Sequence, residues 1–191
     1  MKGFDDMGLA EFERKREEKI DGVIYDMSPR PHYLHGVINS NIHRIVSVGL
    51  KGSMYLVFME NLDFHYHPNQ NDDYVCPDIM IACDRKHLKG SFYNGIPKFI
   101  VETLSPSTAK KDRTVKKDIY EQAGVEEYWI VSPHGKSVEI YYLKDEKYIL
   151  EENYILQDDK EDEDYNAEQE ICLRAFPHIK MMLGEIFEGV Y

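Results

Sequence analysis

Hydrophobic residues recur along this chain with two spacings, one typical of helices and one typical of strands. Between Pro31 and Leu50 they return every three or four positions, which predicts a helix with one buried face, and Gly52 stands just past its end. Helices interspersed with strands predict a mixed α/β or α+β fold. The strands are expected in the shorter apolar runs at 54–59, 64–67, 75–83, 98–104, 127–132, 137–143 and 147–156.

The segment after the strand at 98–104 predicts a second helix. Ser105 followed by Pro106 is a typical helix start, with a capping serine and a proline at the first helical position. Gly124 is a typical stop after Ala123. We therefore expect a helix over 105–123, directly after an apolar strand.

Both ends of the chain carry further predicted elements. Residues 1–18 are charged and predict a helical lead-in, and residues 20–27 predict a strand pair that turns near Asp21-Gly22. No repeat or linker divides the chain, so we expect one domain over residues 1–191. Residues 171–191 predict a short strand and then an amphipathic helix through Ile179, Met182, Leu183, Ile186 and Phe187.

The composition is that of a soluble globular protein. Hydrophobic residues make up 42% of the chain, and no apolar run approaches the roughly 20 residues of a membrane span. The N-terminal residues lack the apolar core of a signal peptide, and the three cysteines are not in C-x-x-C spacing. We therefore expect a cytoplasmic protein with reduced thiols.

The formal net charge of −12 argues at first against a nucleic-acid partner, but the charge is unevenly distributed. Between Asp84 and Asp118, nine bases and four acids give a local net charge of +5, which leaves −17 for the rest of the chain. Such a basic segment can meet phosphates, although a solvated lysine-rich helix face would look the same. The acidic segment 157–165 lacks the glycine and glutamate spacing of a calcium-binding EF-hand, so we expect a solvated loop there.

Two acidic residues lie on apolar, strand-like runs, where an uncompensated carboxylate is costly. Asp78 belongs to the expected strand at 75–83 and Glu102 to the one at 98–104. If these strands lie side by side, the two carboxylates would share one divalent cation, and the carbonyl oxygen of Thr103 could add a ligand. Magnesium is often held by only one or two protein carboxylates. The sequence therefore predicts a Mg²⁺ (or Mn²⁺) site.

The second helix would bring further polar groups to this site. Asp112, Lys116 and Tyr120 stand four residues apart and so lie roughly along one helix face. Lys116 could direct its ammonium group back over the sheet, where it would act on the attacking water or on the phosphate. The alternative is an ordinary Asp112–Lys116 pair on a surface helix, which contributes roughly a few tenths of a kcal/mol.

Other polar residues allow further interpretations. His65 and His67 would point the same way from a strand and could form half of a zinc site, but no second pair of ligands is evident. His35 could face the site or pack at the start of its helix. Glu18 and Asp21 could be extra acidic ligands, although a charged lead-in and a turn explain them equally well.

Several motifs of the chain together match one known family. The central ones are Pro77-Asp78, Val101-Glu102-Thr103-Leu104-Ser105-Pro106-Ser107-Thr108, Asp112 with Lys116 and Tyr120, and Gly124-Val125-Glu126-Glu127-Tyr128-Trp129. The match extends to Ile20-Asp21-Gly22, Met27-Ser28-Pro29, His35 and Phe176-Pro177. With these motifs the chain resembles the Uma-two family of restriction-endonuclease-like proteins, long treated as a domain of unknown function, over nearly its whole length. That family belongs to the PD-(D/E)-x-K nuclease superfamily.

The resemblance implies a central mixed sheet flanked by helices, a divalent metal and hydrolysis of phosphodiester bonds. Carried over by position, Asp78 and Glu102 would be the metal carboxylates and Lys116 the catalytic lysine, with His35, Asp112 and Tyr120 as accessory residues. The usual superfamily lysine would stand two residues after Glu102, where this chain has Leu104. The match therefore implies that the lysine has moved to the following helix. There Lys117 is a second candidate, although it points about 100° away from Lys116.

These observations predict a metal-dependent DNA endonuclease that forms a homodimer. Two alternatives remain open: a catalytically silent nucleic-acid-binding or assembly module that keeps the fold, and a zinc hydrolase that uses His65 and His67. The DNA would meet the basic residues of the second helix, which are Lys110, Lys111, Arg113 and Lys117.

Overall fold

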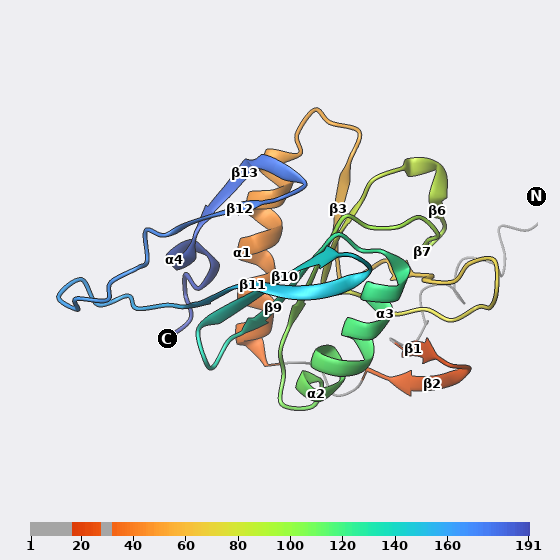
Figure 1. The fold of residues 1–191 in the computed structure, drawn as a ribbon, viewed down its shortest axis with the longest axis horizontal. Helices are drawn as coiled ribbons and strands as arrows, with labels where there is room; N and C mark the ends of the chain where they lie inside the picture. Colours follow the sequence, from red (N-terminus) through yellow and green to blue (C-terminus); the bar gives the residue numbers. More distant parts are fainter. Residues whose placement is uncertain (1–16, 28–31) are drawn as a thin grey trace, which may run out of the picture.

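A six-stranded sheet forms the centre of the fold in the computed structural model, which describes residues 17–27 and 32–191 (Figure 1). Its strand order is β11-β10-β9-β8-β5-β3. Strands β8 and β9 are parallel and all other neighbours are antiparallel, so the predicted mixed sheet is confirmed. The strands are β3 (Leu56–Met59), β5 (Ile79–Ala82), β8 (Phe99–Thr103), β9 (Glu127–Ser132), β10 (Ser137–Lys144) and β11 (Lys147–Ile155).

Helices and smaller sheets cover both faces of the central sheet (Figure 1). One face packs against helix α1 (Tyr33–Gly49) and against a C-terminal unit of β12 (Glu170–Leu173), β13 (Phe176–Met182) and α4 (Leu183–Ile186). The other face packs against helix α3 (Lys117–Ala123) and against the small sheet of β4 (Asp63–Phe64), β6 (Leu88–Lys89) and β7 (Phe92–Tyr93). The 3-10 helix η1 (Arg85–His87) directly precedes β6.

The two-residue period of the strands divides the core between these faces. On β5, Ile79 and Ile81 pack toward α1, whereas Met80 packs toward α3. On β9, Trp129 packs on the α1 side of the sheet and Tyr128 on the α3 side, and both are fully buried. Because both faces are covered, these strands appear in the sequence as continuous apolar runs.

The second predicted helix exists, but it begins later than expected. It consists of α2 (Ala109–Lys111), a wider π-helical turn η2 (Asp112–Lys116) and α3, and it ends at Gly124, whose φ of 85° gives the expected left-handed stop. The predicted start at Ser105 is wrong, because the Ser105 carbonyl accepts from the N–H groups of Thr108 and Ala109 in a turn that precedes the helix.

The N-terminal hairpin turns where the sequence predicted. Strands β1 (Glu17–Ile20) and β2 (Val23–Asp26) are antiparallel and connect through Asp21 and Gly22, at φ values of 51° and 76°. The expected helical lead-in is wrong for Glu17 and Glu18, which form part of β1. The rest of that lead-in (1–16), the Ser28-Pro29 motif and the helix start at Pro31 lie outside the described residues.

Several other boundaries differ from the prediction. The strand at 54–59 begins only at Leu56, the strand at 64–67 shrinks to β4, and the one at 75–83 shrinks to β5. Asp78 therefore immediately precedes its strand. The predicted C-terminal helix is wrong over 176–182, which form β13, because pairing with β12 satisfies the backbone of that segment. Only α4 is helical there.

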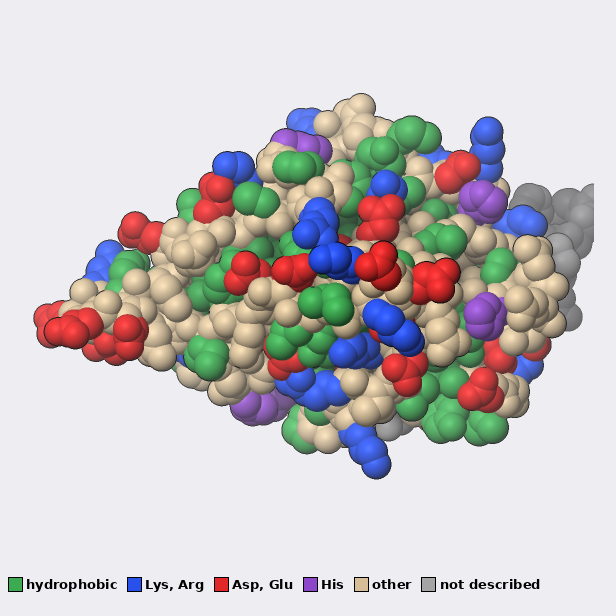
Figure 2. Space-filling model, viewed as in Figure 1, with side chains coloured by type: hydrophobic (Ala, Val, Ile, Leu, Met, Phe, Trp, Pro, Cys, Tyr) green, Lys and Arg blue, Asp and Glu red, His purple; other side chains and the backbone are tan. Residues whose placement is uncertain are grey.

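The acidic loop between β11 and β12 lies at one end of the molecule, where Figure 2 shows its red side chains at the far left. Among the helices of residues 17–27 and 32–191, none is long and apolar enough to cross a membrane. The three cysteines Cys76, Cys83 and Cys172 are free thiols.

A buried carboxylate fixes the C-terminal unit to the central sheet. Glu127, at the start of β9, is fully buried and accepts hydrogen bonds from Trp129 Nε1 and from the backbone N–H of Arg174, both at 2.8 Å. Arg174 lies in the turn between β12 and β13, and its guanidinium packs 3.8 Å from the centre of the Tyr142 ring. Burial raises the pKa of Glu127 to about 7, although these N–H donors oppose the rise.

Glu127 makes stability dependent on pH. Because its pKa is higher in the folded chain than in the unfolded chain, the native state binds the proton more tightly, and the free energy of unfolding falls as pH rises from about 4.5 to about 7. Glu127→Gln imitates the protonated carboxyl group. We therefore expect the difference in the free energy of unfolding, variant minus wild type, to increase by about 3 kcal/mol as the pH rises from about 4.5 to about 7. Urea denaturation of both proteins at pH 4.5, 6 and 8 measures this change, and a difference that stays constant with pH would contradict it.

Candidate functional site

Asp78 and Glu102 lie at the same end of two neighbouring strands. Strands β5 and β8 are antiparallel with Ile79 opposite Val101, so the residues one position further along, Asp78 and Glu102, share one face of the sheet. Both side chains are buried, at 8% and 2% exposure, and both line the same cavity of about 370 Å³. The prediction that the two acidic strands lie side by side is confirmed.

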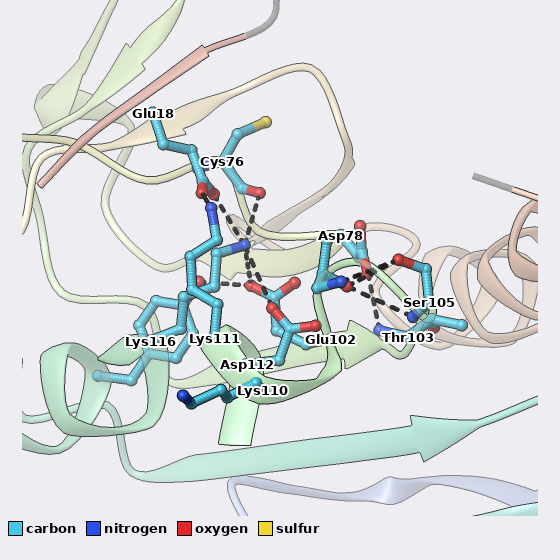
Figure 3. Close-up of polar contacts among 12 residues, drawn as sticks. Glu18, Cys76, Asp78, Glu102, Thr103, Ser105, Lys110, Lys111, Asp112 and Lys116 are labelled. Atoms are coloured by element: carbon cyan, nitrogen blue, oxygen red, sulfur yellow. Dashed lines mark hydrogen bonds and ion pairs between the residues drawn. The ribbon is translucent and has the colours of Figure 1, made fainter. Parts of the chain in front are cut away.

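Lys116 points into this cavity rather than into solvent (Figure 3). Its ammonium lies 2.9 Å from Glu102 Oε1, which also accepts a hydrogen bond of 2.5 Å from the hydroxyl of Tyr120. Asp112, Lys116 and Tyr120 are all buried, so the helix face predicted from their spacing is confirmed. The alternative of an exposed Asp112–Lys116 pair on a surface helix is wrong.

Glu18, which the sequence offered as a possible extra acidic ligand or as part of a charged lead-in, is a member of this cluster. It is fully buried, and one of its oxygens lies 2.8 Å from the Lys116 ammonium while the other accepts 2.5 Å from Lys111. It also accepts from the backbone N–H of Cys76 at 3.2 Å, two residues before Asp78. Among the many charged residues that surround it in the sequence, Glu18 carried no local signal of burial.

Asp78 is held by a second network on its other side. One carboxylate oxygen accepts from the backbone N–H of Thr103 at 2.7 Å and contacts His35 Nε2 at 2.9 Å. The His35 side chain from α1 therefore faces the site, and the alternative that it only packs at its helix start is wrong. The other ring nitrogen of His35 lies 3.4 Å from Glu60, a residue that the sequence analysis missed.

Asp112 carries a buried oxygen that lacks a partner among the described residues. Its side chain is 1% exposed and lines the cavity, and its Oδ1 accepts no hydrogen bond there. Its nearest cation is Lys116, at 4.0 Å. A buried acceptor without a donor is destabilising, which makes this oxygen an available ligand.

Burial and charge together shift the pKa values in the cavity. Burial raises the pKa of Glu102 well above its usual range; the Lys116 ammonium opposes this rise, and the Asp78 carboxylate adds to it. Burial likewise raises the pKa of Asp112 to about 6. Burial lowers the pKa of Lys116, but Glu102 and Glu18 outweigh it and raise that pKa overall. Hydrogen bonds to Asp78 and Glu60 raise the pKa of His35 to about 10 despite its burial.

The residues that line the cavity contain more acids than bases. Two lysines and one imidazole face six carboxyl groups there: Glu18, Asp26, Glu60, Asp78, Glu102 and Asp112. Carboxylate oxygens are the ligands that Mg²⁺ and Mn²⁺ prefer, and a bound cation would offset this excess of negative charge. The donor set, together with the unpartnered oxygen of Asp112, therefore fits a divalent cation.

Three of the four basic residues expected to meet DNA make contacts within the chain. Lys111 pairs with Glu18, Arg113 binds both oxygens of Glu139 at 2.6 and 2.7 Å, and the Lys117 ammonium lies 4.0 Å from the centre of the Tyr141 ring. Lys110 is exposed. In Figure 2, lysine and arginine side chains lie over α2 and α3, with acidic side chains among them.

The remaining candidates do not join the cavity. Its lining includes neither of the two zinc candidates nor Asp21, which lies in the hairpin turn. The zinc candidate His65 packs 4.2 Å from the Phe92 ring, measured between ring centres. Within the described ranges, the group of three possible metal ligands consists of His35, Glu60 and Asp78, so the zinc interpretation of His65 and His67 gains no support.

The fold is that of a restriction-endonuclease-like protein, and comparisons with known proteins agree. Residues 4–172 match the model of the Uma2 (Uma-two) family, described as "Putative restriction endonuclease", and the chain belongs to this family. It is 30% identical over 137 residues to uncharacterized protein slr1290 of Synechocystis sp. (strain ATCC 27184 / PCC 6803 / Kazusa), covering 71% of this chain and 70% of that protein.

A solved structure shares the fold. It is the crystal structure of a putative nuclease belonging to DUF820 from Anabaena variabilis ATCC 29413, with a TM-score of 0.67 and 17% sequence identity. The alignment covers 92% of this chain and 91% of that one. At this identity the similarity establishes the architecture, and the roles of individual residues have to be argued from their contacts.

The excess of buried carboxylates predicts stabilisation by divalent cations. An ion that binds the native state at about 100 times its Kd adds about 2.7 kcal/mol to the free energy of unfolding. We therefore expect the melting temperature to rise by about 5–10 °C in saturating Mn²⁺ or Mg²⁺, and this rise to be lost in Asp78→Asn. Asp164→Asn, with the same change of charge in the exposed acidic loop, is the control and should keep it. An unchanged melting temperature with both ions would rule out a cation site.

Proposed function

We propose that this protein is a metal-dependent DNA endonuclease whose residues 1–191 form one nuclease domain. The observation that carries the proposal is the buried Lys116 ammonium, which lies 2.9 Å from Glu102 in the cavity that Asp78 also lines. Family membership and the shared fold support a nuclease. The DNA substrate, the metal, a homodimer and a cytoplasmic location are parts of the proposal.

Asp78 and Glu102 would hold Mg²⁺ or Mn²⁺, and the carbonyl oxygen of Thr103 would add a ligand. When bound, such an ion lowers the pKa of a coordinated water and offsets the charge that develops on the phosphodiester. The backbone N–H of Thr103 fixes one oxygen of Asp78, at 2.7 Å. The Tyr120 hydroxyl and the Lys116 ammonium orient Glu102. These contacts hold both carboxylates in place before substrate arrives.

Lys116 would act as a charged donor. Glu18 and Glu102 flank its ammonium at 2.8 and 2.9 Å, and both favour the protonated form. A protonated lysine can donate hydrogen bonds to a phosphate oxygen and stabilise the negative charge of the transition state. Of the two roles that the sequence suggested, this geometry supports stabilisation of the phosphate rather than removal of a proton from water.

A catalytically silent nucleic-acid-binding module is the alternative function. One observation favours it: the Lys116 ammonium is already surrounded by carboxylates of its own chain. The alternative requires that the cavity binds DNA without cleaving it.

A plasmid-nicking assay with Mn²⁺ tests the proposal through Lys116. Removing one preorganised donor typically costs about 100- to 1,000-fold in rate, so Lys116→Ala should slow cleavage by at least about 100-fold. Lys110→Ala is the matched control on the same helical segment. It should change the rate by only a few fold, with an effect that weakens as salt is raised, because an exposed lysine contributes long-range attraction to phosphates.

Lys116→Ala leaves the buried carboxylate of Glu102 without its cation and Glu18 with Lys111 alone, so melting curves must show that each variant is folded. If Lys116→Ala does not fold, Lys116→Met takes its place in the assay, because methionine fills more of the space that the lysine side chain occupied. Equal cleavage by wild type and a folded Lys116 variant would refute the assigned role. A wild type that binds DNA and Mn²⁺ but never cleaves would support the silent module.

A further inference from the structure

We infer that His35, Glu60 and Asp78 form a second ion site, which contains an imidazole nitrogen and takes a first-row transition ion such as Mn²⁺ in preference to Mg²⁺. This inference rests on the proposed function, since Asp78 belongs to both sites. It assigns a ligand role to Glu60, which carried no signal in the sequence, and to the His35 ring.

The three side chains converge from separate parts of the fold. His35 comes from the first turns of α1, Glu60 directly follows β3, and Asp78 directly precedes β5. Each offers a ligand atom, and these atoms all lie within 4.8 Å of one another. All three residues line the cavity, which gives an ion a route from solvent.

Glu60 has an unusual backbone conformation. Its φ is 53°, in the left-handed region that non-glycine residues rarely adopt and that costs on the order of 1 kcal/mol or more. Its N–H donates to the carbonyl oxygen of Asp78 at 3.0 Å, so the two ligand residues are tied together through the backbone. This geometry turns the Glu60 side chain toward His35.

A chain of hydrogen bonds orients the side chains of His35 and Glu60. Asn39, one turn after His35 on α1, donates to Glu60 Oε1 at 2.9 Å and contacts His35 Nδ1 at 3.2 Å. The hydroxyl of Thr103 in turn donates to Asn39 Oδ1 at 2.6 Å. Metal sites commonly use such outer contacts to fix the direction of their ligands. Asn39 is fully buried, so water does not compete for these hydrogen bonds.

The donor chemistry distinguishes this site from that of Asp78 and Glu102. One oxygen of Glu102 already accepts hydrogen bonds from Lys116 and Tyr120, and His35 is not among its partners. The ion shared by Asp78 and Glu102 would therefore have oxygen ligands alone, which suits Mg²⁺. A site with one imidazole and two carboxylates favours transition ions over Mg²⁺. An ion bound to one ring nitrogen of His35 would take the place of the proton on that nitrogen.

Pulsed electron paramagnetic resonance of Mn²⁺ bound to untagged protein tests the inference, because the ion couples measurably to the nitrogen nucleus of a ligating imidazole. We expect a nitrogen signal in wild type, its loss in His35→Gln and in Glu60→Gln, and its retention in Glu102→Gln. His67→Gln is the matched control for adventitious histidine binding and should keep the signal. Competition should need at least about tenfold more Mg²⁺ than Mn²⁺ to displace the nitrogen-coupled ion.

The outcomes separate the inference from the proposed function. Asp78-dependent binding of Mn²⁺ with plasmid cleavage but without a nitrogen signal would overturn this second site and leave the nuclease proposal intact. A nitrogen signal that survives His35→Gln, or disappears in His67→Gln, would also overturn it. Absence of any bound Mn²⁺ would overturn both. A nitrogen signal in a protein that does not cleave DNA would support the ion site and count against the nuclease.

Discussion

The ion cluster around the Lys116 ammonium is the interaction on which the arrangement of the site depends. Three carboxylates surround this buried cation: Glu18 at 2.8 Å, Glu102 at 2.9 Å and Asp112 at 4.0 Å. An unpaired charge in a protein interior costs several kcal/mol, so neither the lysine nor its partners can be buried alone. Because the partners come from β1, β8 and the π-helical turn, this requirement fixes the N-terminal hairpin and the helix relative to the central sheet.

Lys116 does not neutralise all the acids around it, and unusual local geometry accompanies that imbalance. Asp112 keeps an oxygen without a partner among the described residues, Glu60 adopts a left-handed backbone, and the helix widens over the segment that carries Asp112 and Lys116. Such departures from local preference are concentrated at functional sites, where the surrounding structure maintains them. Asp112, Glu60 and Lys116 all line the cavity where Asp78 and Glu102 meet.

The acidic character of the whole chain says little about this site. Much of the negative charge lies in the loop between β11 and β12, at the opposite end of the molecule from the β1–β2 hairpin (Figures 1 and 2). Charges so far apart are largely screened at physiological ionic strength. Around the cavity, lysines stabilise buried carboxylates, as Lys111 and Lys116 both do with Glu18. A count of bases along the sequence therefore overestimates the positive charge left to attract a phosphate.

The sequence by itself determined the features that arise from local periodicity and spacing. The run at 98–104 predicted a strand carrying Glu102, and the four-residue spacing of Asp112, Lys116 and Tyr120 placed them on one helix face. The hairpin turn at Asp21-Gly22 and the helix stop at Gly124 followed from residues that accept a left-handed backbone. Two acids on apolar strands suggested the pairing of Asp78 with Glu102, and the family motifs supported it.

Only the tertiary structure decided which partners those residues have. Nothing local distinguishes Glu18 or Glu60 from other acids of the chain, since their partners are far away in the sequence: Lys116 and Lys111 for Glu18, His35 for Glu60. The segment 176–182 shows the same limit, because pairing with β12 overrides its helical spacing. The burial of a charge and the pairing of a strand both depend on contacts between residues far apart in the sequence. Their free energy is therefore set by the tertiary structure and not by local sequence.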